Sequence, residues 1–179
     1  MIGVSVEVLE SLFCRLRETP VHDVHIPGYI DRDQGRHPRF SALPRSAYLE
    51  LDEGFLHIEG LGDSGQLTMG VVSDFVIPEA LAGEDEEFAV ASIGHLFFDT
   101  AGPPLPITGI RYATTANSDP VAGIVRCVEV ELYNAWPIFA DPMWHFGIRL
   151  GGAGAYHRWV ADADWREPEG VVEELQWRP

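Results

Sequence analysis

The chain has 179 residues, of which 46% are hydrophobic, and this length and composition suit a single globular domain with a sizeable core. It contains twelve arginines, no lysine and 28 acidic residues, which gives a formal net charge of −16. A negative field of this strength repels phosphate groups, so it argues against nucleic acid and against an anionic membrane surface as ligands.

The first expected element is an amphipathic helix over residues 6–18. Its apolar side chains recur at the spacing of one helix face: Val6, Leu9, Leu12, Phe13 and Leu16. Ser5 is a plausible N-cap, and Pro20 stops the helix.

Residues 21–44 are rich in proline, glycine and aspartate, and they predict a long loop. His22, Asp23 and His25 could supply metal ligands, but no regular element would fix them, so a polar loop with chance histidines is favoured. We therefore expect no metal and no cofactor. A third of all arginines lie in or just after this segment, and we expect them to pair with the acidic body: Arg32, Arg36, Arg39 and Arg45.

Residues 46–160 predict a β-rich body. Alternating apolar and polar residues over 47–60 indicate a hairpin whose turn is at Asp52–Gly54. Further strands are expected within 66–78, 93–100, 107–115 and 123–134. The acidic C-terminal segment, 161–179, suits a final strand or a short helix.

These elements predict an α+β fold, mainly an antiparallel sheet, strongly twisted or partly barrel-like, with an N-terminal amphipathic helix. Cys14 and Cys127 form no disulfide framework, and although one long-range bridge would be possible, we expect two buried, reduced thiols. No apolar run is long enough to span a bilayer and no basic leader is present, so the cytoplasm is the expected location.

The segment 136–160 combines three tryptophans with a glycine-rich break. A strand, a glycine-rich turn and a helix can cradle phosphate, but the dinucleotide fingerprint is incomplete. We favour core or interface roles for the tryptophans: Trp136, Trp144 and Trp159.

Four polar residues on expected strands could share one sheet face: Arg111, Glu129, His145 and Arg149. Such a group could line a polar pocket. The favoured interpretation is a solvated outer face with ordinary cross-strand ion pairs.

The leading functional hypothesis is a non-catalytic acidic binding protein that engages a basic partner protein, in the manner of an immunity protein or inhibitor. Taken alone, the charge is better explained by solubility, which needs no partner. The expected partner-binding residues are an acidic loop for steering and two aromatic anchors: Glu84, Asp85, Glu86, Glu87, Trp165 and Trp177.

The alternative is a small-molecule-binding or small enzyme domain with a polar pocket in a curled sheet. It predicts a cavity of several hundred Å³ in which histidine, arginine and carboxylate groups converge. No nucleophile motif is present, so the sequence gives little support for catalysis. A structural subunit of a larger assembly is a third hypothesis, and the oligomeric state is open.

Overall fold

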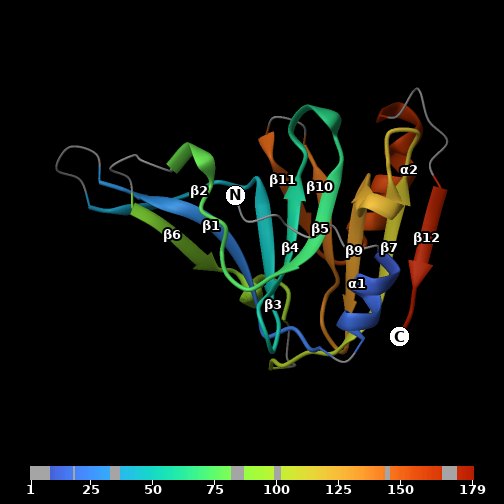
Figure 1. Ribbon diagram of the computed structural model, residues 1–179, viewed down its shortest axis with the longest axis horizontal. Helices are drawn as coiled ribbons and strands as arrows, with labels where there is room; N and C mark the ends of the chain where they lie inside the picture. The colour runs from blue at the N-terminus through green and yellow to red at the C-terminus, as the bar shows by residue number, and fades with distance from the viewer. Residues whose placement is uncertain are drawn as a thin grey trace.

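The computed structural model describes residues 9–17, 19–32, 37–81, 87–98, 102–143, 146–166 and 173–179. Two antiparallel sheets and two α-helices make up most of this part of the chain (Figure 1).

The first sheet has seven strands in the order β2-β1-β3-β4-β5-β8, with β6 paired to the other side of β1. Their bounds are β1 Asp23–Asp31, β2 Arg39–Ala42, β3 Ser46–Glu50, β4 Phe55–Gly60, β5 Leu67–Val72, β6 Glu87–Ser92 and β8 Ile124–Val125.

The second sheet has five strands in the order β11-β10-β9-β7-β12. Their bounds are β7 Ile107–Thr114, β9 Cys127–Leu132, β10 Ile138–Pro142, β11 Ile148–Gly151 and β12 Glu173–Trp177. The α+β class and the antiparallel pairing are confirmed, whereas the strands of the described residues do not close into a barrel.

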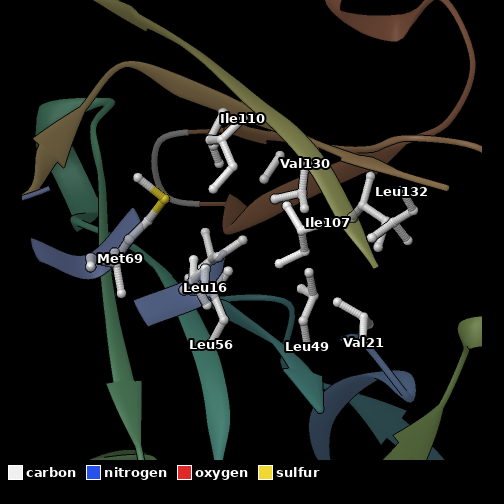
Figure 2. Close-up of a cluster of buried hydrophobic side chains, with 14 of the residues drawn as sticks. Leu16, Val21, Leu49, Leu56, Met69, Ile107, Ile110, Val130 and Leu132 are labelled. Atoms are coloured by element: carbon white, nitrogen blue, oxygen red, sulfur yellow. The ribbon is translucent and has the colours of Figure 1, made fainter. Parts of the chain in front are cut away.

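The main core lies between the two sheets, and Figure 2 shows side chains from both meeting there. Leu49, Leu56 and Met69 come from the first sheet, and Ile110 and Val130 come from the second. Burial of these apolar side chains holds the sheets together, at about 1.5–3 kcal/mol for each fully buried residue.

The N-terminal helix α1 spans Leu9–Leu16, which is shorter than the expected 6–18; residues 6–8 and 18 lie outside the described ranges. Leu9, Leu12, Phe13 and Leu16 are all buried in the main core, as the apolar stripe predicts. Cys14 lies on the opposite side and is exposed, so the expectation that it is buried is wrong.

The long loop expected over 21–44 is wrong, because β1 and β2 occupy most of its described part. Strand β1 pairs first with β3 and then, from Gly28 onward, with β2, while β6 lies along its other side. Pro27 sits at this change of partner, where a residue without a backbone N–H costs the ladder least.

The expected hairpin is confirmed: β3 and β4 pair with Leu49 opposite Leu56, and Gly54 in the turn has φ +75°. Two other expectations are wrong. Residues Gly94–Leu96, expected within a strand, form a 3₁₀ turn labelled η4, and β6 begins at Glu87, inside the expected acidic loop.

Helix α2 spans Ala155–Arg166, so helix replaces the end of the expected β-rich body. It covers the outer face of the second sheet, where Tyr156 and Trp159 pack on Phe139 and Cys127. Trp159 is therefore a core residue as expected, but Trp136 is 51% exposed and Trp144 lies outside the described residues.

The C-terminal segment also contains β12, so it holds both alternatives, the end of a helix and a final strand. None of the helices in the described part of the chain is long and apolar enough to cross a membrane.

Candidate functional site

A row of polar and aromatic side chains crosses the first sheet on the face away from the main core. His25 pairs with Tyr48, Tyr48 pairs with His57, and His57 pairs with Gly70. Residues in register on antiparallel strands project to the same face, so the three rings lie side by side. We call His25, Tyr48 and His57 the histidine row.

Two phenylalanines pack over the histidine row. Phe75, which follows β5, lies with its ring centroid 5.5 Å from that of His25 and 5.1 Å from that of Tyr48. Phe55 contacts Phe75 with centroids 4.3 Å apart. The segment after β5 therefore folds back over the sheet and shields its outer face from water.

At the His57 end of the row lies a cavity of about 560 Å³, which we call the His57 pocket. Strands β3 and β4 form its floor, and the segment after β5 forms part of its wall. The apolar part of its lining consists of Leu43, Tyr48, Val76 and Pro78. The polar part consists of Arg45, Ser46, His57, Glu59 and Glu79.

His57 is the most unusual group in this lining. Its side chain is only 6% exposed, and within the described residues its Nε2 atom has no hydrogen-bond partner. Burial away from water lowers the pKa of His57 from 6.5 to about 4, because desolvation penalises the charged imidazolium. The imidazole is therefore neutral at pH 7 and keeps one buried ring nitrogen without a partner among the described residues.

The ring of Tyr48 supports His57 from one side. The two ring centroids are 4.5 Å apart and the planes are inclined by 14°. The Tyr48 hydroxyl accepts a hydrogen bond from the backbone N–H of Val76 at 3.2 Å. Burial raises the pKa of Tyr48, so the phenol stays protonated and leaves no negative charge next to the imidazole.

Charged groups line the mouth of the pocket. The Nε atom of Arg45 lies 4.0 Å from Oε1 of Glu59, and both side chains are substantially exposed. Glu79 is also exposed. One cation beside two carboxylates leaves the mouth with a formal charge of −1.

At the other end of the histidine row, Asp23 and Glu50 face His25. The His25 Nε2 atom lies 2.8 Å from Glu50 Oε2 and 3.9 Å from Asp23 Oδ2. One donor atom from each of the three residues lies within 4.8 Å of the others, a spacing that could hold a metal ion. The expectation that these histidines belong to an irregular loop is wrong for His25, because β1 fixes its position.

The predicted pocket residues Arg111 and Glu129 meet across β7 and β9. The Arg111 guanidinium donates to Glu129 Oε1 from both Nε, at 3.1 Å, and Nη2. It also lies over the Tyr156 ring, 4.8 Å from the centroid. The cross-strand ion pair is confirmed, but the solvated face is wrong, because helix α2 leaves Glu129 only 1% exposed.

Arg149 binds a different carboxylate. Its Nη2 atom donates to Asp141 Oδ2 at 2.7 Å, and the buried Arg126 donates to the other oxygen of Asp141 at 3.1 Å. His145 lies outside the described residues, so its place in the predicted pocket stays a prediction.

The predicted partner-binding residues are spread over several elements. Glu84, Asp85 and Glu86 lie outside the described residues, as does the side chain of Trp165. Glu87 begins β6 and pairs with Arg32 at 2.6 Å. Trp177 packs its ring on Phe13 of α1, with centroids 5.4 Å apart.

Sequence reasoning did not single out the His57 pocket. The available signal was His57 itself, at an outward position of a clear hairpin between Leu56 and Ile58. Nothing local indicated that the segment after β5 would cover that position. No family model, no curated protein and no solved structure matches the chain.

Proposed function

We propose that the protein binds a small organic molecule in the His57 pocket, without catalysing a reaction on it. The observation that carries the proposal is the buried Nε2 atom of His57, which has no hydrogen-bond partner among the described residues. A buried polar atom left without a partner costs about 1–3 kcal/mol, and a ligand that supplies the partner recovers that free energy.

The size and lining of the pocket support a ligand of drug-like size. About 560 Å³ lies within the range of small-molecule sites, which is roughly 300–1,000 Å³. Apolar side chains line one part and a few polar groups line the other, the usual arrangement for holding and orienting an organic molecule.

Charge narrows the class of ligand. The mouth has a formal charge of −1 and the whole chain has −16, so an anionic ligand would be repelled. We therefore expect an uncharged or cationic molecule with an apolar body and one group that hydrogen-bonds His57. This ranks the pocket above the acidic binding protein that the sequence alone favours.

A fragment screen by protein-observed NMR tests the proposal, with matched sets of uncharged, cationic and anionic fragments. We expect uncharged or cationic hits that shift the His57 ring resonances. His57→Phe keeps an aromatic ring against Tyr48 but removes both nitrogens, and it should weaken these hits at least tenfold. His95→Phe, at an exposed position, is the matched control and should leave them unchanged.

Three results would contradict the proposal. They are a screen with no hit at the pocket, hits that bind His57→Phe as tightly as wild type, and a set of hits that is mainly anionic.

Engagement of a basic partner protein is a second candidate function. Val76 and Ile77 are 46% and 56% exposed, and the exposed carboxylates of Asp74 and Glu79 flank them. Apolar anchors beside carboxylates suit a basic surface with an apolar centre. Purified basic candidates should bind less tightly as salt increases and at least tenfold less tightly to Ile77→Ser; binding insensitive to both changes would contradict this candidate.

A further inference from the structure

The polar end of the histidine row carries an inference that does not depend on the His57 pocket. Asp23 and His25 are two residues apart on β1, so their side chains project to the same face. Glu50 of β3 pairs directly with Asp23. Strand geometry alone therefore brings an imidazole and two carboxylates together on one side of the sheet.

The donor atoms are close to the spacing that a metal ion requires. Four ligands placed tetrahedrally about 2.0–2.1 Å from Zn²⁺ lie roughly 3.3 Å from one another. The His25 Nε2 atom lies 2.8 Å from Glu50 Oε2 and 3.9 Å from Asp23 Oδ2, on either side of that value. Each of these two distances differs from that value by about half an ångström, so small side-chain rotations would bring both pairs to coordination spacing.

Surrounding groups already orient two of the three ligands. The Asp23 carboxylate accepts hydrogen bonds from the Ser92 hydroxyl at 2.6 Å and from the backbone N–H of Gly94 at 3.0 Å. The His25 ring packs edge-on against Phe55 and Phe75, at centroid distances of 6.0 and 5.5 Å. Partners of this kind fix ligands in metal sites, and their loss typically costs 10–100-fold in affinity.

We propose that Asp23, His25 and Glu50 form a binding site for a divalent transition-metal ion, with Zn²⁺ as the best fit. An imidazole nitrogen favours zinc and its neighbours in the first transition row over Ca²⁺ and Mg²⁺, which prefer oxygen ligands. Two carboxylates neutralise the charge of the ion. The three side chains are 15–42% exposed, so the ion has access and a water molecule can take the fourth position.

The hydrogen bond between His25 and Glu50 competes with metal binding, because it uses a donor atom of each ligand. Without an ion, His25 Nε2 and Glu50 Oε2 form a hydrogen bond of 2.8 Å. A metal ion takes the lone pair of that nitrogen, so binding replaces this hydrogen bond with coordination by both residues.

The test uses the whole protein, freed of metal by a chelator and titrated with Zn²⁺ by calorimetry. Cobalt(II) serves as a second probe, because its visible absorption reports tetrahedral coordination. We expect one equivalent of Zn²⁺ to bind. His25→Ala and Glu50→Gln should each weaken binding at least tenfold, and Ser92→Ala should weaken it about tenfold.

His22→Ala provides a matched control. His22 lies three residues before His25 but pairs with Asp52 at 2.7 Å, outside the proposed ligand set. Zinc binding should be unchanged in this variant. Circular dichroism checks that each variant is folded, and Glu50→Gln, at a 42% exposed position, keeps the test available if His25→Ala unfolds.

Two outcomes would overturn the site: no stoichiometric Zn²⁺ binding by the wild-type protein, or binding that is equally tight in Glu50→Gln. Neither outcome affects the His57 pocket, whose test uses organic fragments in the absence of metal.

Discussion

The imidazole of His57 stacks on the phenol ring of Tyr48, with centroids 4.5 Å apart and planes inclined by 14°. The two residues are direct cross-strand partners on β3 and β4, so the stack follows from the register of the hairpin. The contact buries one face of the imidazole and leaves its Nε2 atom without a described partner. A protonated ring would lose hydration here without gaining a counter-ion.

This burial predicts a specific dependence of stability on pH. The pKa of His57 is about 4 in the folded protein and 6.5 without burial, so the unfolded chain binds the extra proton first. Above pH 6.5 the imidazole is mainly neutral in both states and does not reduce the stability of the folded protein. As the pH falls toward 4, the unfolded chain takes up a proton at His57 and the free energy of unfolding decreases. From these two pKa values, His57 should remove about 2 kcal/mol from the free energy of unfolding between pH 7 and pH 5.

Urea denaturation of wild type and His57→Phe at both pH values isolates this contribution, because all other titrating groups are shared. The decrease in stability should be about 2 kcal/mol smaller in the variant. Equal decreases in the two proteins would show that His57 titrates normally.

A second prediction concerns Asp141, which binds two arginines of different exposure. Arg126 is 4% exposed, whereas the Arg149 side chain is 49% exposed. Asp141→Ala leaves the Arg126 charge buried without this carboxylate, so we expect a loss of about 3–5 kcal/mol in the free energy of unfolding. Arg149→Ala removes only the exposed arm of the network and should cost less than about 1 kcal/mol. Chemical denaturation measures both, and similar costs would contradict this difference in burial.

The parts of the fold that local sequence encodes were predicted well. The β3–β4 hairpin follows from alternation and from the glycine at positive φ in its turn. Strand β1 was not predicted because Pro27 and Gly28 are usual loop residues, and because its pairing with β6 joins residues that are 57 to 67 positions apart in the sequence. Such pairing depends on tertiary contacts that a local pattern does not contain.

In the candidate sites too, some features follow from the local sequence and others depend on tertiary contacts. Alternation places His57 on the outer face of its strand, and the pairing of Arg111 with Glu129 follows from two adjacent strands. Two other features depend on how elements distant in the sequence pack together. Helix α2 buries Glu129, and Phe75 covers the histidine row. The group of Asp23, His25 and Glu50 required the correct assignment of β1.

The two cysteines should differ sharply in reactivity. Cys14 is exposed on α1, whereas Cys127 is buried beneath α2, where desolvation raises the pKa of its thiol. Because the thiolate is the reactive form, one thiol per chain should react with a disulfide reagent in native buffer and two in denaturant. Cys14→Ser should abolish the native reaction, and a thiol that reacts fast in the folded variant would contradict the burial of Cys127.

Gly28 tests the unexpected pairing of β1 with β2. A Cβ atom at this position would lie 2.5 Å from a ring carbon of Phe40 and would also meet the backbone oxygen of Ser41. The ring can rotate away, but the backbone oxygen cannot move without separating the strands. Gly28→Ala should therefore cost about 1–3 kcal/mol in the free energy of unfolding and speed hydrogen exchange of the β2 amides. Gly102→Ala is the control, because a Cβ added there meets no described atom within 4 Å, and it should be close to neutral. Equal stability of the two variants would mean that β2 does not pack against β1 at Gly28.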